Sequence, residues 1–331
     1  MTTMTERENF FRIINGQQPA WTPCFYDAYA PCGSSLLNNQ GERGVGGRDM
    51  YGVNWLVSAD TGFEAIPDPR EHILDEVTDW RDIIHFPDLD AMDWAAAAQK
   101  DMAHVDRENK VVCYYSMEGN FNRLQSFMGV CEALMAMLED TEEVCELFEA
   151  LTEFKIKSIE KVAQYYKPDI FVNGDDVCAS SGLFFSPALH DELIKPYEKR
   201  IAQAAIDHGM LVEHHVCGKV TDIIDHLVDT GARIWQTAQP MNDLNGIKAK
   251  YGDKLLIHGG WDSTGPHNMD DATEEMVRAE VRRCIDTYGA DGNYMLFPII
   301  IGDPAAGIMQ RKRAWASDEC RKYSEKLFAK N

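Results

Sequence analysis

Short apolar runs alternate with helical periods along this chain after residue 109, and few folds accept that pattern. Each run is rich in β-branched or aromatic residues, ends at turn residues, and is followed by a segment with helical spacing. Alternating strands and helices predict a parallel sheet, because each helix returns the chain to the same edge. The predicted strands are residues 111–115, 169–172, 211–215, 234–236, 255–258 and 294–297.

Two of the helical segments carry clear start or stop signals. Ser186 is a good N-cap and Pro187 suits the first helical position, which predicts a helix over residues 187–208. The segment 220–230 is followed by Gly231, a residue that readily adopts the left-handed conformation that ends helices.

A parallel sheet of this kind is either an open doubly wound sheet or a closed barrel. No GxGxxG or Walker-type loop follows a predicted strand, which disfavours an open sheet that binds nucleotides. Six strand–helix units after residue 109, together with one or two earlier strands such as residues 22–26, come close to eight. We therefore predict an α/β fold of the (β/α)8 TIM-barrel type.

The first third of the sequence is less regular than the rest. It contains a glycine-rich turn at residues 44–47 and a stretch punctuated by prolines over residues 67–87. No long Ser/Gly/Pro linker separates it from the remainder. We expect residues 1–331 to form one domain, in which 1–108 supply N-terminal loops and the first strands and 109–331 supply the regular βα units.

Charge and composition disfavour several classes of protein. The formal net charge of −22 argues against binding to nucleic acid or anionic membranes, which require a basic surface. No run approaches the roughly 18 apolar residues of a membrane span, and no signal-peptide pattern is visible, so we expect a cytoplasmic protein. The nine cysteines include no CxxC pair and predict free thiols. The oligomeric state stays open, with a homodimer as one option.

Polar and ionisable residues follow five of the predicted strands, whose bodies are apolar. Barrel enzymes carry their catalytic groups at the carboxyl ends of the strands, so this convergence predicts an active site there. In strand order these residues are Glu118, Asn120 and Arg123; Asn173, Asp175, Asp176 and Cys178; Glu213, His214, His215 and Cys217; Gln236 and Gln239; and His258, Trp261 and Asp262.

His215 and Cys217 are two residues apart, so in an extended strand their side chains lie on the same face. Imidazole nitrogen and thiolate sulfur are ligands that Zn²⁺ binds tetrahedrally, and a catalytic zinc has about three protein ligands and one open position. We predict that His215 and Cys217 bind a metal, with Glu118 as a candidate third ligand. The alternative is a core histidine beside an inert buried cysteine.

The remaining strand-end residues are assigned to catalysis or to substrate binding. Each has a plain alternative as a loop charge, a helix cap, a strand histidine or a core aromatic residue. Catalytic roles, mainly general acid and base, are predicted for Asp176, Glu118 and His258. Substrate contacts are predicted for Tyr115, Asn120, Asp175, Trp261 and Asp262.

Four segments of the chain match, in order, the motifs of a known family. They are residues 49–55; 174–176 with 183–187 and 194–197; 215–218; and 251–255 leading to 259–260. Together they resemble the uroporphyrinogen decarboxylase superfamily, and within it the branch of cobalamin-dependent methyltransferases and O-demethylase components. The resemblance implies a (β/α)8 barrel with a funnel at its carboxyl face. It also implies zinc at His215 and Cys217, which match the family's His-x-Cys positions, and a separate corrinoid protein as partner.

The sequence departs from the family pattern at two places. Thiol-methylating members carry a further cysteine ligand near the C-terminus, whereas residues 297–304 contain none. Either the third ligand comes from elsewhere, such as Glu118, Asp176 or Cys178, or the site binds metal weakly or not at all. The missing cysteine also removes support for coenzyme M as methyl acceptor. Decarboxylases carry an early arginine-containing segment, whereas the corresponding residues 23–29 contain no cation, which disfavours porphyrinogen decarboxylation.

The resemblance leads us to expect a methyltransferase. It would move a methyl group between a small methylated, in particular methoxylated, molecule and the cobalt of a separate corrinoid protein, with zinc as Lewis acid. Two alternatives stay open. One is a metal-independent decarboxylase or lyase that acts on a small carboxylated substrate, and the other is a non-enzymatic binder of a corrinoid or tetrapyrrole.

Overall fold

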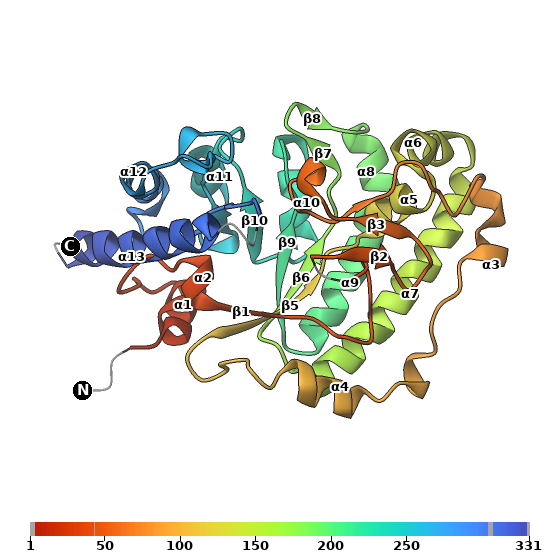
Figure 1. The fold of residues 1–331 in the computed structure, drawn as a ribbon, viewed down its shortest axis with the longest axis horizontal. Helices are drawn as coiled ribbons and strands as arrows, with labels where there is room; N and C mark the ends of the chain where they lie inside the picture. Colours follow the sequence, from red (N-terminus) through yellow and green to blue (C-terminus); the bar gives the residue numbers. More distant parts are fainter. Residues whose placement is uncertain (1–3, 43, 304–306, 330–331) are drawn as a thin grey trace.

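The computed structural model describes residues 4–42, 44–303 and 307–329. Pro304, the last residue of the segment 297–304 that lacks the family's C-terminal cysteine, lies outside the described residues. Its centre is a parallel sheet that curls around an interior, with helices on the outside (Figure 1). This architecture confirms the predicted α/β barrel class. Within the described residues the sheet has seven strands, in the order β1 (Tyr29–Cys32), β5 (Val111–Ser116), β6 (Ile170–Gly174), β9 (Leu211–His215), β10 (Ile234–Ala238), β11 (Leu256–Gly259) and β12 (Tyr294–Leu296).

The six strands predicted after residue 109 are confirmed, with ends that differ from the prediction by at most two residues. The strand predicted at residues 22–26 is wrong. The backbone there makes one parallel bridge, between Cys24 and Leu296, and the Leu296 N–H donates to the Pro23 carbonyl over 2.9 Å. Pro23 has no N–H for a ladder. The Cys24 carbonyl instead accepts from the N–H groups of the short helix α2 (Phe25–Ala28), and the first full strand follows.

The helices lie outside the sheet, mostly in the connections between strands (Figure 1). The predicted helix over residues 187–208 is divided into two, because Pro196 lies at the start of a second helix and cannot continue the first. Ser186 caps the first of these as expected, since its side chain accepts from Leu189 N–H. Apart from α2 and the helices of the segment between β1 and β5, the α-helices of the described residues are α1 (Glu6–Ile14), α5 (Asn120–Met128), α6 (Val130–Glu139), α7 (Thr141–Tyr165), α8 (Pro187–Leu193), α9 (Lys195–Asp207), α10 (Ile224–Asp229), α11 (Leu244–Tyr251), α12 (Glu274–Cys284) and α13 (Ile308–Phe328).

The segment between β1 and β5 forms the irregular decoration that the sequence predicts. It contains a small antiparallel sheet of β2 (Gly46–Arg48), β3 (Asn54–Leu56) and β4 (Ile66–Pro67), and the short helices α3 (Trp80–Ile83) and α4 (Trp94–Asp101). A further hairpin of β7 (Cys178–Ala179) and β8 (Gly182–Leu183) follows β6. A buried ion pair between Asp49 and Arg123 of α5 joins the decoration to the barrel, with 2.7 Å between Oδ2 and Nη1.

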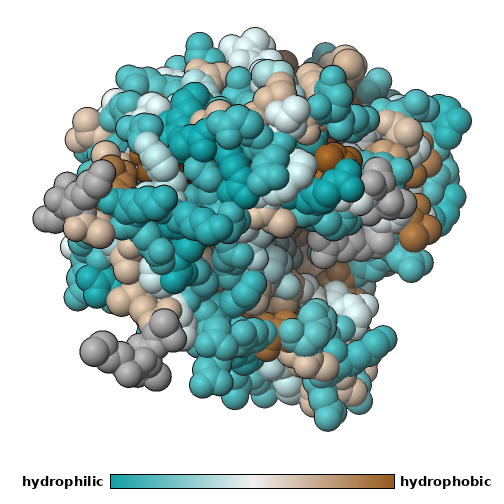
Figure 2. All heavy atoms as spheres, turned by 60° about the vertical axis from the view of Figure 1, so that its left-hand side comes forward, coloured by the Kyte–Doolittle hydropathy of each residue, from teal (hydrophilic) through white to brown (hydrophobic). Residues whose placement is uncertain are grey.

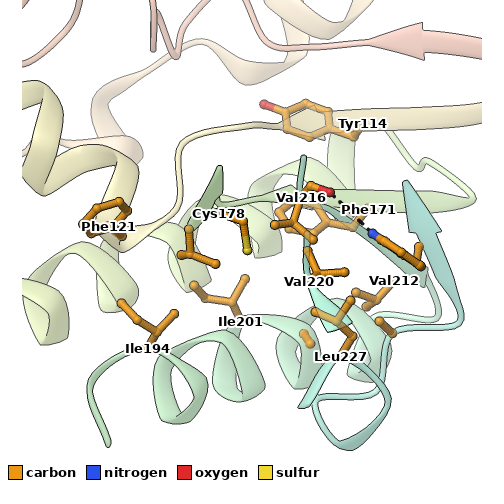
Figure 3. Close-up of a cluster of buried hydrophobic side chains, with 14 of the residues drawn as sticks. Tyr114, Phe121, Phe171, Cys178, Ile194, Ile201, Val212, Val216, Val220 and Leu227 are labelled. Carbon is orange, nitrogen blue, oxygen red and sulfur yellow. Dashed lines mark hydrogen bonds between the residues drawn. The ribbon is translucent and has the colours of Figure 1, made fainter. Parts of the chain in front are cut away.

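Strand alternation divides the core into an inner and an outer layer. Val111, Ile170 and Leu256 belong to an inner cluster that also includes Phe10 and Ile13 of α1. The intervening residues face the helices. Figure 3 shows Phe171 and Val212 of the sheet packed with Ile201 of α9 and Leu227 of α10. By the same alternation, residues 213 and 215 of β9 face inward.

One face of the molecule is largely polar. Figure 2 shows a face covered mainly by hydrophilic residues, with scattered apolar side chains. Within the part of the chain that the structure describes, none of the helices has both the length and the apolar character that crossing a membrane requires.

Candidate metal centre

Three side chains with ligand atoms meet where β6 and β9 end. Asp176 follows β6, His215 is the last residue of β9, and Cys217 lies two residues further on. A carboxylate oxygen, an imidazole nitrogen and the cysteine sulfur lie within 4.8 Å of one another. In residues 4–42, 44–303 and 307–329, this is the only group of three or more His, Cys, Asp or Glu residues with that spacing. All three are partly exposed.

The register of the sheet brings Asp176 to this place. Gly174 of β6 pairs with His215 of β9, and the Asp175 N–H donates to the His215 carbonyl over 3.1 Å. One residue further on, Asp176 Oδ1 accepts a 2.7 Å hydrogen bond from the Cys217 N–H. Of the three candidates for a third ligand, the structure therefore brings Asp176 to the pair; Glu118 and Cys178 are not members of the group.

The His215 ring is held from the side opposite the cysteine. Its Nδ1 lies 2.7 Å from Gln236 Oε1, and its Nε2 lies 3.6 Å from Cys217 Sγ. Burial lowers the pKa of His215, but the hydrogen bond and the charge of Cys217, with the charge of Asp176, outweigh burial and raise that pKa to about 9. The imidazole therefore lies between two acidic groups that favour its protonated form.

The turn after Cys217 requires a glycine. Gly218 has a φ of 90°, and a Cβ at this position would lie 2.6 Å from the Ala179 carbonyl oxygen. The Gly218 N–H donates to Gln239 Oε1 over 2.7 Å, and Cys217 Sγ lies 3.2 Å from Thr237 Oγ1. The backbone can therefore turn closely past β7 while the sulfur stays beside the imidazole.

Two of the other predicted residues reach the centre through Gln236. Tyr115 OH accepts a 3.2 Å hydrogen bond from Gln236 Nε2. His258 Nδ1 lies 2.7 Å from Glu213 Oε1, and that oxygen also accepts from Gln236 Nε2 over 2.8 Å. His258, Tyr115 and His215 thus belong to one hydrogen-bonded network on the inner face of the barrel.

Asp175 lies beside Asp176 in sequence but has a different environment. Its carboxylate accepts from the N–H groups of Phe121 and Asn122 over 3.1 and 2.9 Å, at the first turn of α5. Burial raises the pKa of Asp175 to about 7, against the lowering effect of these hydrogen bonds and of Lys155. The contacts of Asp175 are those of a helix cap.

Glu118 and Asn120 line a small cavity of about 40 Å³ between β5, α7 and the decoration. Glu118 Oε1 accepts from Gln40 Nε2, and burial raises the pKa of Glu118. Asn120 Nδ2 donates to Thr152 Oγ1 of α7 over 3.0 Å. Both side chains therefore lie in the outer layer, apart from the three ligand residues.

Trp261 and Asp262 shape the loop after β11. The Trp261 indole is fully buried and donates to Asn268 Oδ1 over 3.1 Å. Asp262 Oδ1 accepts from the Thr264 N–H over 2.9 Å. These side-chain hydrogen bonds stay within the loop, and the Asp262 N–H donates to Glu280 Oε1 of α12 over 2.9 Å. No hydrogen bond from Trp261 or Asp262 to the three ligand residues is found among the described residues.

Sequence reasoning placed Glu213 and Gln236 among the strand-end residues without assigning them a specific role, and it missed Thr237. Glu213 and Gln236 stand at strand ends, and Glu213 shares the inward face with His215, so the two-residue spacing could have identified it. Thr237 carries no comparable signal. Its register against β11 is irregular, so regular alternation does not predict which way it faces.

One solved structure shares this architecture. A solved structure of a methyltransferase from Methanosarcina mazei matches with a TM-score of 0.68 at 13% identity, covering 97% of this chain and 99% of that one, which shows a shared fold. A xylose isomerase-like TIM barrel protein from Mycobacterium smegmatis, in complex with magnesium, has a TM-score of 0.37 at 13% identity, with 67% and 76% covered. No curated protein matches this chain in sequence.

The family model described as uroporphyrinogen decarboxylase (URO-D) matches residues 64–298. The matched region includes Asp176, His215, Cys217 and every strand of the sheet except β1. Because it covers more than half of the 331 residues, the chain belongs to the uroporphyrinogen decarboxylase (URO-D) family.

Proposed function

We propose that this chain is a methyltransferase that moves a methyl group between a small methylated molecule, in particular a methoxylated one, and the cobalt of a separate corrinoid protein. The observation that carries the proposal is the convergence of Asp176, His215 and Cys217 at the carboxyl ends of two barrel strands. Membership of the URO-D family and a fold shared with a protein titled a methyltransferase support it.

The donor set fits a zinc ion. Oxygen, nitrogen and sulfur donors within 4.8 Å of one another match the ligand types of Zn²⁺, and three protein ligands leave a fourth position open. His215 Nδ1 is already held by Gln236, an arrangement usual for metal-binding histidines. When bound, the zinc would act as a Lewis acid on the heteroatom that carries the methyl group.

Hydrogen bonds from the surrounding residues position the donor atoms of Asp176 and Cys217. Asp176 uses Oδ1 to accept from the Cys217 N–H, so its other oxygen is left to bind the metal. The Thr237 hydroxyl, 3.2 Å from Cys217 Sγ, can donate to a thiolate and stabilise it. All three ligand residues are partly exposed, so the centre is not sealed inside the core.

Other roles follow from position within the proposed site. Tyr115 and His258 belong to the inner network and would face the substrate. The cobalt of the corrinoid protein would accept the methyl group. Glu118 lies in the outer cavity, so Asp176 takes the carboxylate role at the metal. A cytoplasmic location is part of the same proposal.

The test combines metal analysis with turnover. Protein purified without added metal should contain stoichiometric zinc in the wild type and in Cys131→Ala, a change of an exposed cysteine on α6, and little in His215→Ala or Cys217→Ala. Methoxyaromatic and methylamine-type donors are then screened with a reduced corrinoid protein, whose absorbance should change only when donor and wild-type enzyme are both present.

Three results would contradict the proposal. Absence of zinc together with a fully active His215→Ala variant would point to a metal-independent decarboxylase or lyase. Tight corrinoid binding with no donor-dependent change would point to a binding protein. Loss of zinc in Cys131→Ala would show that the metal is not bound at the three-residue centre.

A further inference from the structure

A fully buried carboxylate lies one side chain behind His215. Glu213 is two residues earlier on β9, faces the same interior and is 0% exposed. Its Oε2 accepts from Tyr29 OH over 2.8 Å. Its Oε1 accepts from Gln236 Nε2 over 2.8 Å and lies 2.7 Å from His258 Nδ1. Since a carboxylate can only accept hydrogen bonds, each of these three partners must present a hydrogen to it.

This requirement fixes the orientation of the Gln236 amide. The NH₂ group must face Glu213, and it also donates to Tyr115 OH over 3.2 Å. The amide oxygen then faces His215 Nδ1 at 2.7 Å. A flipped amide would place its oxygen against the carboxylate and leave a buried acceptor without a donor, which is costly.

The amide orientation in turn determines which nitrogen of His215 is free. An acceptor oxygen at Nδ1 requires a hydrogen there, so in the neutral ring that binds a metal Nε2 carries the lone pair. Nε2 is the nitrogen that lies 3.6 Å from Cys217 Sγ. We infer that Glu213 and Gln236 are positioning residues that hold His215 with Nε2 toward the metal, in a relay of carboxylate, amide and imidazole.

Strand β10 supports the cysteine in the same way. Thr237 Oγ1 lies 3.2 Å from Cys217 Sγ, so consecutive residues of β10 hold the two ligands of the His-x-Cys pair. Successive side chains of a regular strand point to opposite faces. The pairing of β10 with β11 shifts register between Gln236 and Ala238, and such an irregularity can redirect a side chain toward a site.

The inference rests on the zinc of the proposed function, and its test measures zinc affinity by competition with a chromophoric chelator. Gln236→Leu removes the acceptor at His215 Nδ1 and should weaken zinc binding about 10- to 100-fold, the usual effect of losing such a partner. Glu213→Gln still offers an oxygen to the Gln236 amide, so its zinc affinity should fall less than that of Gln236→Leu. Gln125→Leu is the matched control, because Gln125 of α5 donates to Asn122 and lies outside this network.

A second measurement needs no variant of the relay. In the zinc-loaded wild type labelled with ¹⁵N-histidine, the protonated nitrogen of His215 should be Nδ1, with His215→Ala used to assign the signal. A protonated Nε2, or unchanged zinc affinity in a folded Gln236→Leu variant, overturns the inference while the zinc site stands. A wild type that binds no zinc overturns the proposed function as well, so the two failures are distinguishable.

Discussion

Cys217 and Asp176 are 41 positions apart, yet the backbone N–H of Cys217 donates a 2.7 Å hydrogen bond to Asp176 Oδ1. The bond ties the turn after β9 to the turn after β6. It also means that the carboxylate and the thiol cannot move independently, because the residue that supplies the sulfur also anchors the oxygen. The geometry of the centre therefore depends on two adjacent loops, whose relative position is set by the parallel register of β6 and β9.

This relationship predicts graded effects at Asp176. Asp176→Asn keeps an oxygen for the Cys217 N–H but loses the charge, whereas Asp176→Ala loses both. Zinc affinity should fall in the order wild type, Asn, Ala. The alanine variant should lose at least the roughly 10- to 100-fold typical of an outer partner. Chelator competition measures it, and Asp207→Asn on the exposed end of α9 should bind zinc like the wild type. Equal affinities in all four proteins would remove Asp176 from the ligand set.

Close packing around Asp175 predicts that Gly119 tolerates no larger side chain. A Cβ at Gly119 would lie 2.2 Å from Asp175 Cγ, and Asp175 holds the first turn of α5. Gly119→Ala should therefore lower the free energy of unfolding by about 1–3 kcal/mol, the usual cost of overpacking. Urea denaturation measures the change. Gly33→Ala is the control, because no atom lies within 4 Å of its Cβ position. Equal stability of the two variants would show that the Asp175 side chain can move away from a Cβ at position 119 without loss of stability.

The barrel and the His-x-Cys pair could be predicted from sequence because both depend on local periodicity. Apolar runs of the right length identified the six later strands, and two-residue spacing placed His215 and Cys217 on one face. The early strand could not be found this way. A proline and a four-residue helix occupy the place where the pattern suggested a strand.

The third ligand could not be chosen from sequence because tertiary hydrogen bonds decide it. Asp175 and Asp176 are adjacent and chemically identical, but the backbone of α5 binds one and the Cys217 N–H binds the other. Glu118 also follows a strand, yet Gln40 of the decoration binds its carboxylate in the outer layer. Only the packed structure separates these three carboxylates.

The buried ion pair between Arg123 and Asp49 predicts a large stability effect. Both side chains are nearly inaccessible, and Asp49 also accepts from the Trp55 indole over 3.0 Å. Arg123→Met leaves a buried carboxylate without its cation and should cost about 3–5 kcal/mol of unfolding free energy, measured by chemical denaturation. The exposed pair of Arg48 and Glu71 gives the control. Arg48→Met should cost only about 0–1 kcal/mol, and a similar loss in both variants would contradict the prediction.

A buried carboxyl of α9 makes stability depend on pH. Neither oxygen of Glu198 has a hydrogen-bond partner among the described residues, although His214 Nε2 lies 3.5 Å from Oε1. Burial, with the negative charge of Asp175, raises the pKa of Glu198 to about 8, and nearby Lys155 only partly opposes this. Burial lowers the pKa of His214 to about 3, so this imidazole offers no cation.

The folded chain therefore favours the protonated form of Glu198 more than the unfolded chain does. This contribution to stability is complete below the ordinary pKa of 4.5 and is lost as the pH rises through about 8. Wild-type unfolding free energy should fall relative to Glu198→Gln between pH 5 and 8, by on the order of a few kcal/mol. Urea denaturation at each pH measures the difference. Glu153→Gln, at an exposed site on α7, should give a curve parallel to the wild type. A Glu198→Gln curve that also ran parallel would show that Glu198 is already ionised in the folded chain.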